Sequence, residues 1–147
     1  MKITNKTIAI ETKKRFDITD ITDNAAAFLE ESGVKNGLIN IQTLHTTATI
    51  FVQENEPCLL QDIINHLERV APQSINYKHD DFTHRTVNIC ADECRNGHSH
   101  CKALNLPTSV TLNVIEGKMQ LGTWQKILFI ELDAARPRKV QFQIIGE

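Results

Sequence analysis

The feature that most constrains the fold of this chain is a segment of strong helical periodicity near its middle. Its apolar residues recur on one broad face, namely Leu59, Leu60, Ile63, Ile64, Leu67 and Val70. Pro57 lies in the first turn, where a missing amide hydrogen costs nothing, and Asn55 or Glu56 is positioned to cap the helix. Any fold of this sequence must therefore include an amphipathic helix that begins near Pro57.

Two further helices are predicted. Residues 20–32 repeat apolar side chains at helical spacing, Asp20 or Thr22 can cap the start, and Gly33 is typical of a helix end. A short third helix is plausible from about Asn96, whereas the segment before it lacks periodicity and is predicted to be irregular.

The remaining regular segments favour β-structure. Strand patterns fall at residues 3–12, 37–53, 108–115, 121–132 and 139–145, and the second of these breaks near His45 into two strands. The last three are joined by short turns, which predicts an antiparallel meander. No repeat, low-complexity tract or linker divides the chain. The sequence therefore predicts one α+β domain over residues 1–147.

Composition excludes several classes of protein. Hydrophobic residues make up 41% and charged residues 23%, which rules out a disordered tail, a collagen-like fibre and a coiled coil. The longest apolar run, Ile127 to Ile130, is far shorter than the roughly 20 residues of a membrane span. The net charge of −2 provides no basic field for nucleic acid, and residues 1–6 lack a signal-peptide stretch. We expect a cytoplasmic protein with neither membrane nor nucleic acid as a partner.

Histidine and cysteine crowd into one window. Four of six histidines lie between positions 79 and 100, together with Cys90, Cys94 and Cys101. In a reducing cytosol these thiols should be reduced, and such a cluster indicates metal or thiol chemistry before disulfides. If residues 94–101 are helical, Cys94, His98 and Cys101 share a face that zinc would accept, although the spacing matches no zinc finger. The alternative is that these cysteines are small core residues.

Three polar segments are candidates for chemistry, each with a plain structural alternative. His45 lies between threonines, which either orient its imidazole or simply favour a strand. Glu54 and Glu56 flank the start of the central helix, where they bind a divalent cation or favour the helix dipole. His79 with its neighbouring carboxylates indicates a metal or acid/base site, or else a solvated turn. His84 and Arg85 extend this polar cluster and are candidates to bind an anion.

The last third of the chain adds two candidates. Trp124 is the only tryptophan, and lone tryptophans are usually core or interface anchors. Arg136 and Arg138 flank Pro137. They either form paired hydrogen bonds to a phosphate or carboxylate group, or they are surface charges at a turn.

Taken together, five short motifs occur in one order. They are His45-Thr46-Thr47-Ala48, Glu54-Asn55-Glu56, Tyr77-x-His79-Asp80, Asn96-x-x-x-His100 and Gly117-x-x-x-Leu121-Gly122-x-Trp124-Gln125. In this combination the chain resembles the YjbQ-type family, often labelled secondary thiamine-phosphate synthase, from about residue 8 to residue 146. Family members commonly read Asp-Gly-Pro-Arg after the long strand, whereas this chain reads Asp133-Ala134-Ala135-Arg136, which weakens an anion-binding role for its arginines.

The resemblance implies two packed antiparallel sheets with two to three helices outside, a homotrimer, and a polar pocket near the subunit boundary. The large apolar side chains of residues 121–132 are also too many for one solvent-facing sheet, which favours the trimer. The expected catalytic residues are His45, Glu54, Glu56 and Asp80. The expected substrate-binding residues are Thr46, Thr47, Asn96, Trp124 and Gln125. The expected metal ligands are His45, His79 and His100, with zinc and magnesium both open.

The family label describes coupling of a pyrimidine diphosphate to a thiazole phosphate, which yields thiamine phosphate and pyrophosphate. That reaction needs a cation for the leaving pyrophosphate and donors for two phosphorylated substrates. Carboxylates and histidines of this chain can supply them, yet the sequence has no glycine-rich phosphate loop. We therefore expect an enzyme that acts on a phosphorylated small molecule. The alternatives are a non-catalytic metal- or metabolite-binding homotrimer and a trimeric scaffold.

Overall fold

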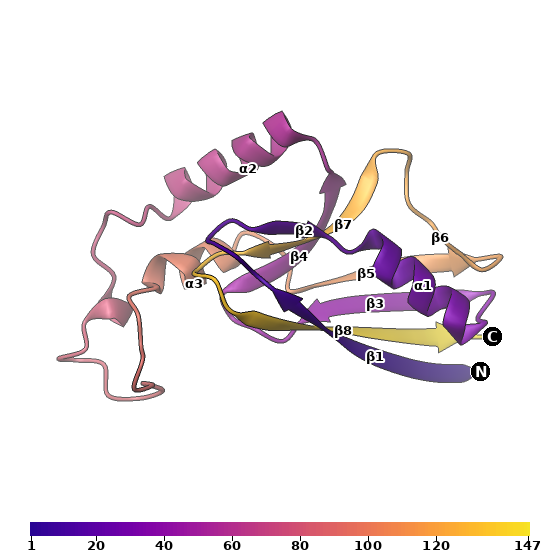
Figure 1. The fold of residues 1–147 in the computed structure, drawn as a ribbon, viewed down its shortest axis with the longest axis horizontal. Coiled ribbons are helices and arrows are strands. Elements are labelled where there is room, and N and C mark those ends of the chain that lie inside the picture. The colour runs from indigo at the N-terminus through magenta and orange to yellow at the C-terminus, as the bar shows by residue number, and fades with distance from the viewer.

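Two antiparallel sheets and three α-helices make up the computed structural model, which describes all residues from 1 to 147 (Figure 1). The large sheet has the order β1 (Lys2–Glu11), β8 (Pro137–Gly146), β3 (Gly37–Thr43), β5 (Ser109–Ile115) and β6 (Lys118–Met119). The small sheet has the order β2 (Ile18–Asp20), β7 (Gln125–Glu131) and β4 (Ala48–Glu54). This arrangement confirms the predicted α+β class.

The core lies on both faces of the small sheet. On one face Ile127 and Phe129 of β7 join a 16-residue cluster with the inward side chains of the large sheet. On the other face Leu128 and Ile130 pack with Phe51 and residues from the helical side. Burial on both faces explains the continuous apolar run of β7. The argument that this run needs a second subunit to cover it was therefore wrong.

The predicted meander is also wrong. Strand β5 pairs with β3, β7 pairs with β4 and β2, and β8 pairs with β1 and β3. The turn at Glu116–Gly117 makes only the short β5–β6 pairing, after which the chain crosses to the other sheet and β7 begins at Gln125. Short connections do not fix which strands pair when a chain alternates between two sheets.

The helices follow the sequence closely. Helix α1 (Thr22–Ser32) ends at Gly33, whose φ of 69° is left-handed, and the Asp20 carboxylate accepts from the first amide of the helix. Helix α2 (Pro57–Val70) begins where predicted, with Glu56 as its cap. The chain has no helix of the length and apolarity that crossing a membrane requires.

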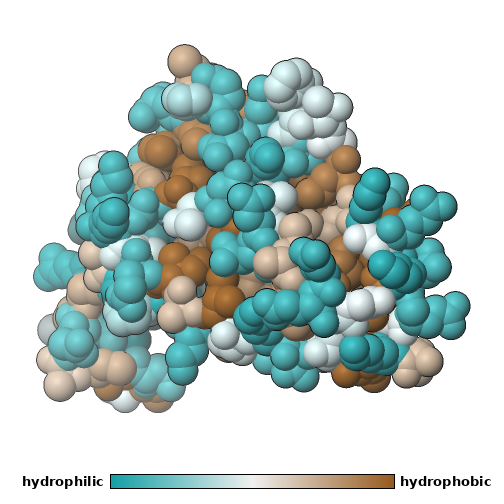
Figure 2. All heavy atoms as spheres, turned by 45° about the vertical axis from the view of Figure 1, so that its right-hand side comes forward, coloured by the Kyte–Doolittle hydropathy of each residue, from teal (hydrophilic) through white to brown (hydrophobic).

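Helices α2 and α3 (Gly97–Ala103) and the 3-10 helix η1 (Lys78–Asp80) lie together at the opposite end from α1 (Figure 1). Helix α2 buries only Leu67, so the rest of its apolar face is half-buried or exposed. Hydrophilic groups interrupt the apolar ones on the face drawn in Figure 2, and no single continuous apolar patch covers it. The polar segments of interest therefore sit at the helical end of a two-sheet core.

Candidate functional site

A tight contact between η1 and the start of α3 builds the first part of the site. The Gly97 amide donates to Asp80 Oδ1 at 2.8 Å, and a Cβ on Gly97 would lie only 2.5 Å from Tyr77 Cβ. Only glycine allows this approach. As a result the rings of His79 and His100 meet edge to face, with centroids 4.5 Å apart. Asp80, which we expected to be catalytic, joins the two segments through one carboxylate oxygen.

Two polar atoms beside this histidine pair lack a partner. His79 Nε2 and Asn96 Oδ1 are both buried and make no hydrogen bond. Asn96 is the residue before α3, and its carbonyl accepts from the His100 amide at 3.3 Å. Burial, followed by the neighbouring His79, lowers the pKa of His100, which is therefore a neutral imidazole at pH 7.

Asp133 completes the group that we call the histidine site, comprising His79, His100, Asn96, Asp133 and Arg136. Its buried Oδ2 accepts from Asn96 Nδ2 at 3.1 Å and from Arg136 Nη2 at 2.6 Å. The thiol of Cys94 lies 3.7 Å from the same oxygen. The sequence analysis did not propose Asp133 as a site residue, although an aspartate two residues beyond a buried strand was an available signal, and it considered Cys94 only as a zinc ligand or a core residue.

A second buried network lies directly beside the histidine site. Arg138 donates to both carboxylate oxygens of Glu131 at 2.5 Å and to Thr47 Oγ1 at 2.9 Å. Glu131 also accepts from Thr12 Oγ1 and from the Asp133 amide. Thr47 is almost fully buried in this network. Arg138 thus uses its Nε and Nη2 donors within this network, one of them toward Thr47. The expected contact of Thr47 with substrate stays a prediction.

His45 lies beside this network. The Lys139 amide donates to His45 Nε2 at 2.7 Å, which makes Nδ1 the protonated nitrogen. Burial, followed by the charge of Arg138, lowers the pKa of His45. No group of three or more His, Cys, Asp or Glu side chains in the chain is arranged to hold a metal ion. One subunit therefore does not bring His45, His79 and His100 together as a metal centre. Thr46, beside His45, is exposed.

The other expected residues gather at the far end of the small sheet, which we call the tryptophan end: Glu54, Glu56, Trp124 and Gln125. Glu54 pairs with Gln125 in the β4–β7 register, whereas Ala48 pairs with Glu131 at the opposite end. Strands of seven residues are about 20 Å long. The single pocket expected for all these residues therefore does not exist within one chain.

Glu56 has a structural explanation at the tryptophan end. Its two carboxylate oxygens accept from the amides of Cys58 and Leu59 at 2.9 and 2.7 Å. These bonds lower the pKa of Glu56. The carboxylate therefore caps α2, which is a structural role, and its expected catalytic role stays a prediction. Trp124 is 71% exposed, which excludes a core role in the single chain.

The cysteine-ligated zinc site is not formed. Helix α3 begins at Gly97, so Cys94 lies outside it and does not share a face with His98 and Cys101. All four cysteines are free thiols, and His98 contacts Lys102. Arg85 is also explained structurally, because it binds Glu93 at 2.8 Å within its own loop.

Comparisons with known proteins decide the family. The family model described as UPF0047 protein YjbQ-like matches residues 6–147. The chain belongs to this family. A UPF0047 protein of Methanothermobacter thermautotrophicus is 36% identical over 147 residues, covering 100% of this chain and 95% of the relative. The YjbQ-family protein YugU of Bacillus subtilis is 34% identical, covering 96% of this chain and 98% of its own.

Solved structures of the YjbQ family share the fold. A YbjQ-like protein of unknown function from Sulfolobus solfataricus superposes with a TM-score of 0.89 at 33% identity, covering 99% of both chains. A YjbQ/UPF0047 protein from Clostridium acetobutylicum gives 0.82 at 33% identity, covering 95% of this chain and 99% of its own. The resemblance drawn from the five motifs is confirmed.

Proposed function

We propose that this YjbQ-family chain is an enzyme that acts on a phosphorylated small molecule at the histidine site. The observation that supports this most is the pair of unpartnered buried atoms, His79 Nε2 and Asn96 Oδ1. Folded proteins pair nearly all such atoms, so unpaired ones indicate a place for a ligand. Here both lie against an imidazole pair and a buried carboxylate.

The side chains suit proton transfer. A neutral His100 can accept a proton near pH 7, since burial lowers its pKa. Arg136 and Asn96 hold Asp133 so that its carboxylate stays fixed beside the imidazoles. In this proposal His100 acts as the base, His79 contacts the ligand through Nε2, and Asp133 positions the pair.

The finer form of the proposal follows the family resemblance. It is the coupling of a pyrimidine diphosphate to a thiazole phosphate, giving thiamine phosphate and pyrophosphate as a secondary activity. The leaving pyrophosphate requires positive charge nearby, which Arg136 supplies in part. We propose the cytoplasm as the location, where the four free thiols would stay reduced.

The proposal includes a divalent metal that this chain would bind together with a substrate or with a second copy of the chain. His79 and His100 would provide two imidazole nitrogens, which suit zinc better than magnesium. No third His, Cys, Asp or Glu side chain is arranged with them to hold a metal ion, so the remaining ligands would come from substrate oxygens or a neighbouring subunit. When bound, the metal would polarise a phosphoryl oxygen.

We also propose a homotrimer. Two different groups of motif residues lie at opposite ends of the small sheet, as the β4–β7 register requires. A head-to-tail contact that closes after three copies would set the tryptophan end of one copy against the histidine site of the next. The 71% exposed side chain of Trp124 supports this, because tryptophan favours interfaces.

The test is a metal analysis of the purified chain, followed by a screen of phosphate esters and thiamine precursors for phosphate or pyrophosphate release. His100→Ala should lower turnover about a hundredfold or more, as expected for loss of a general base. His66→Ala, an exposed histidine on α2, is the matched control and should have no effect. Ligand or metal retention without turnover would support the non-catalytic binding protein and contradict the enzyme.

A further inference from the structure

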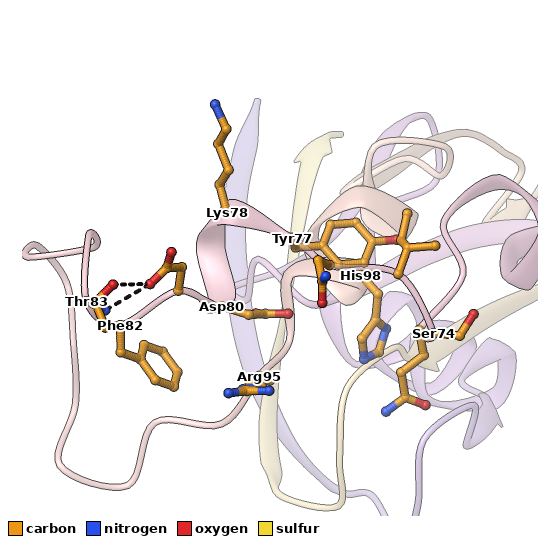
Figure 3. Close-up of a pocket in the computed structure, with 12 residues that line it drawn as sticks. Ser74, Tyr77, Lys78, Asp80, Phe82, Thr83, Arg95 and His98 are labelled. Atoms are coloured by element: carbon orange, nitrogen blue, oxygen red, sulfur yellow. Dashed lines mark hydrogen bonds between the residues drawn. The ribbon is translucent and has the colours of Figure 1, made fainter.

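A second cavity lies outside the histidine site. It has a volume of about 750 Å³ and is lined by residues 73–78 and 80–83 together with Arg95 and His98 (Figure 3). Only three of its twelve lining residues are hydrophobic. A volume of this size suits a small metabolite. His98 and His100 are two positions apart on α3 and therefore project in nearly opposite directions.

His98 is built into the wall of this cavity in one protonation state. Its side chain is 2% exposed, and its Nδ1 lies 3.1 Å from Nζ of Lys102, which is fully buried. Lys102 also donates to the Ala71 carbonyl at 2.6 Å and forms an ion pair with Glu68. An ammonium group can only donate, so Nδ1 of His98 must accept and the proton must sit on Nε2.

The protonated nitrogen is free to meet a ligand. Both polar contacts of the His98 ring, to Ser99 and to Lys102, involve Nδ1, and Nε2 makes no hydrogen bond within the chain. Figure 3 shows the ring among the residues that line the cavity. His98 therefore offers the cavity a fixed N–H donor.

The charged side chains that line the cavity are two cations and two carboxylates. Asp80 accepts from the Gly97 amide through Oδ1, and Asp81 accepts from Thr83 and His84 through both of its oxygens. The side chains of Lys78 and Arg95 make no hydrogen bond or ion pair, and that of Lys78 extends away from the other labelled side chains in Figure 3. Three of the four carboxylate oxygens are thus engaged, whereas both cations lack a partner.

We propose that this cavity is an oxyanion site that binds the phosphate or pyrophosphate group of a small metabolite. Arg95 supplies positive charge in the cavity wall, Lys78 adds a second charge from η1, His98 Nε2–H supplies a directed hydrogen bond, and Lys102 is a positioning residue that fixes the tautomer. Arginine and lysine strengthen such bonds because the donors are charged. The inference deepens the proposed function by giving the phosphorylated substrate a phosphate subsite, yet the binding itself requires no turnover.

The experiment titrates the full chain with inorganic phosphate and with pyrophosphate by calorimetry at fixed ionic strength. We expect saturable binding, and we expect the double variant Lys78→Gln/Arg95→Gln to weaken it at least about tenfold. Lys118→Gln removes an exposed charge on β6 and should leave the affinity unchanged. Absence of saturable binding, or an unchanged affinity in the double variant, would overturn the proposal.

His100→Ala separates this inference from the proposed function. Phosphate should still bind to that variant if the cavity is the site, even where turnover is lost. Loss of phosphate binding in His100→Ala, with the double variant unaffected, would show that the anion binds at the histidine site and would overturn the inference.

The role of Lys102 has its own measurement. Nitrogen-15 NMR of the unmodified protein should show His98 as the Nε2–H tautomer, with its Nε2 signal shifting on addition of pyrophosphate. The Nδ1–H tautomer, or an unmoved signal at saturation, would contradict the assignment. Lys102→Met keeps most of the side-chain volume, and His98 should then no longer be held as the Nε2–H tautomer. If that variant does not fold, the measurement on the unmodified protein still tests the assignment.

Discussion

The Glu131–Arg138 network and the histidine site lie side by side, yet only the first is complete. Each oxygen of Glu131 accepts two hydrogen bonds, and the donors come from three residues, Thr12, Asp133 and Arg138. In the histidine site, His79 Nε2 and Asn96 Oδ1 are buried with nothing to bind. Closed networks of buried polar groups stabilise a fold, whereas open ones leave capacity for a ligand.

The largest effect should come from breaking the closed network. Arg138→Met leaves the Glu131 carboxylate buried without its cation, which should cost about 3–5 kcal/mol of unfolding free energy. Urea denaturation measures this, with Lys139→Met as the exposed neighbouring control. A loss below about 1 kcal/mol would show that the Glu131–Arg138 network contributes little to the stability of the fold.

Gly97→Ala should have the next largest effect, because its Cβ would lie 2.5 Å from Tyr77 Cβ. We expect a loss of about 1–3 kcal/mol, as for overpacking elsewhere, and a separation of the two histidine rings. NMR of the imidazole signals and urea denaturation would record both. Gly122→Ala is the control, since the nearest atom to its added Cβ is a glutamine side-chain oxygen at 3.4 Å.

The open site should respond in the opposite way to the closed network. His79→Leu removes an unpartnered buried nitrogen, so stability should stay within about 1 kcal/mol of the parent. Ligand or metal binding should fall at the same time. If His79→Leu were as destabilising as Arg138→Met, the distinction between the two networks would fail.

The smallest effect concerns pH. His45, His98 and His100 have pKa values lowered from 6.5, chiefly by burial, so the unfolded chain binds more protons than the folded one at acidic pH. Their contribution to stability is complete above about pH 6.5 and is lost as the pH falls below it. Urea midpoints should therefore decrease between pH 7.5 and pH 5.5. In His45→Asn the decrease should be smaller, and an equal decrease would count against His45.

The sequence predicted the helices well because their signals are local. The apolar periodicity and Pro57 place the start of α2 correctly, and Gly33 marks the end of α1. The strand partners of β5, β7 and β8 could not be predicted in this way, since pairing depends on which of two sheets each strand enters. Burial of β7 on both faces was visible only as an unbroken apolar run.

The site was predictable in part. The motifs identified His79, Asp80, Asn96 and His100, which the structure places on two adjoining segments. They did not reveal that Glu54 and Gln125 lie at the other end of the sheet, because the order of motifs along a sequence does not give the distances between them in the fold. The burial of Lys102 could not be predicted either. Its four-residue spacing from His98 does indicate that the two side chains lie on one helix face.

The burial of β7 between two apolar clusters also sets where the molecule can move. Asp133 lies two residues beyond this strand, so one side of the histidine site is attached to the part of the chain whose amides should exchange slowest with solvent. His79 comes from the other side, on a segment of turns and exposed residues. A ligand can therefore enter by local opening of that segment, while the carboxylate that receives it stays in place.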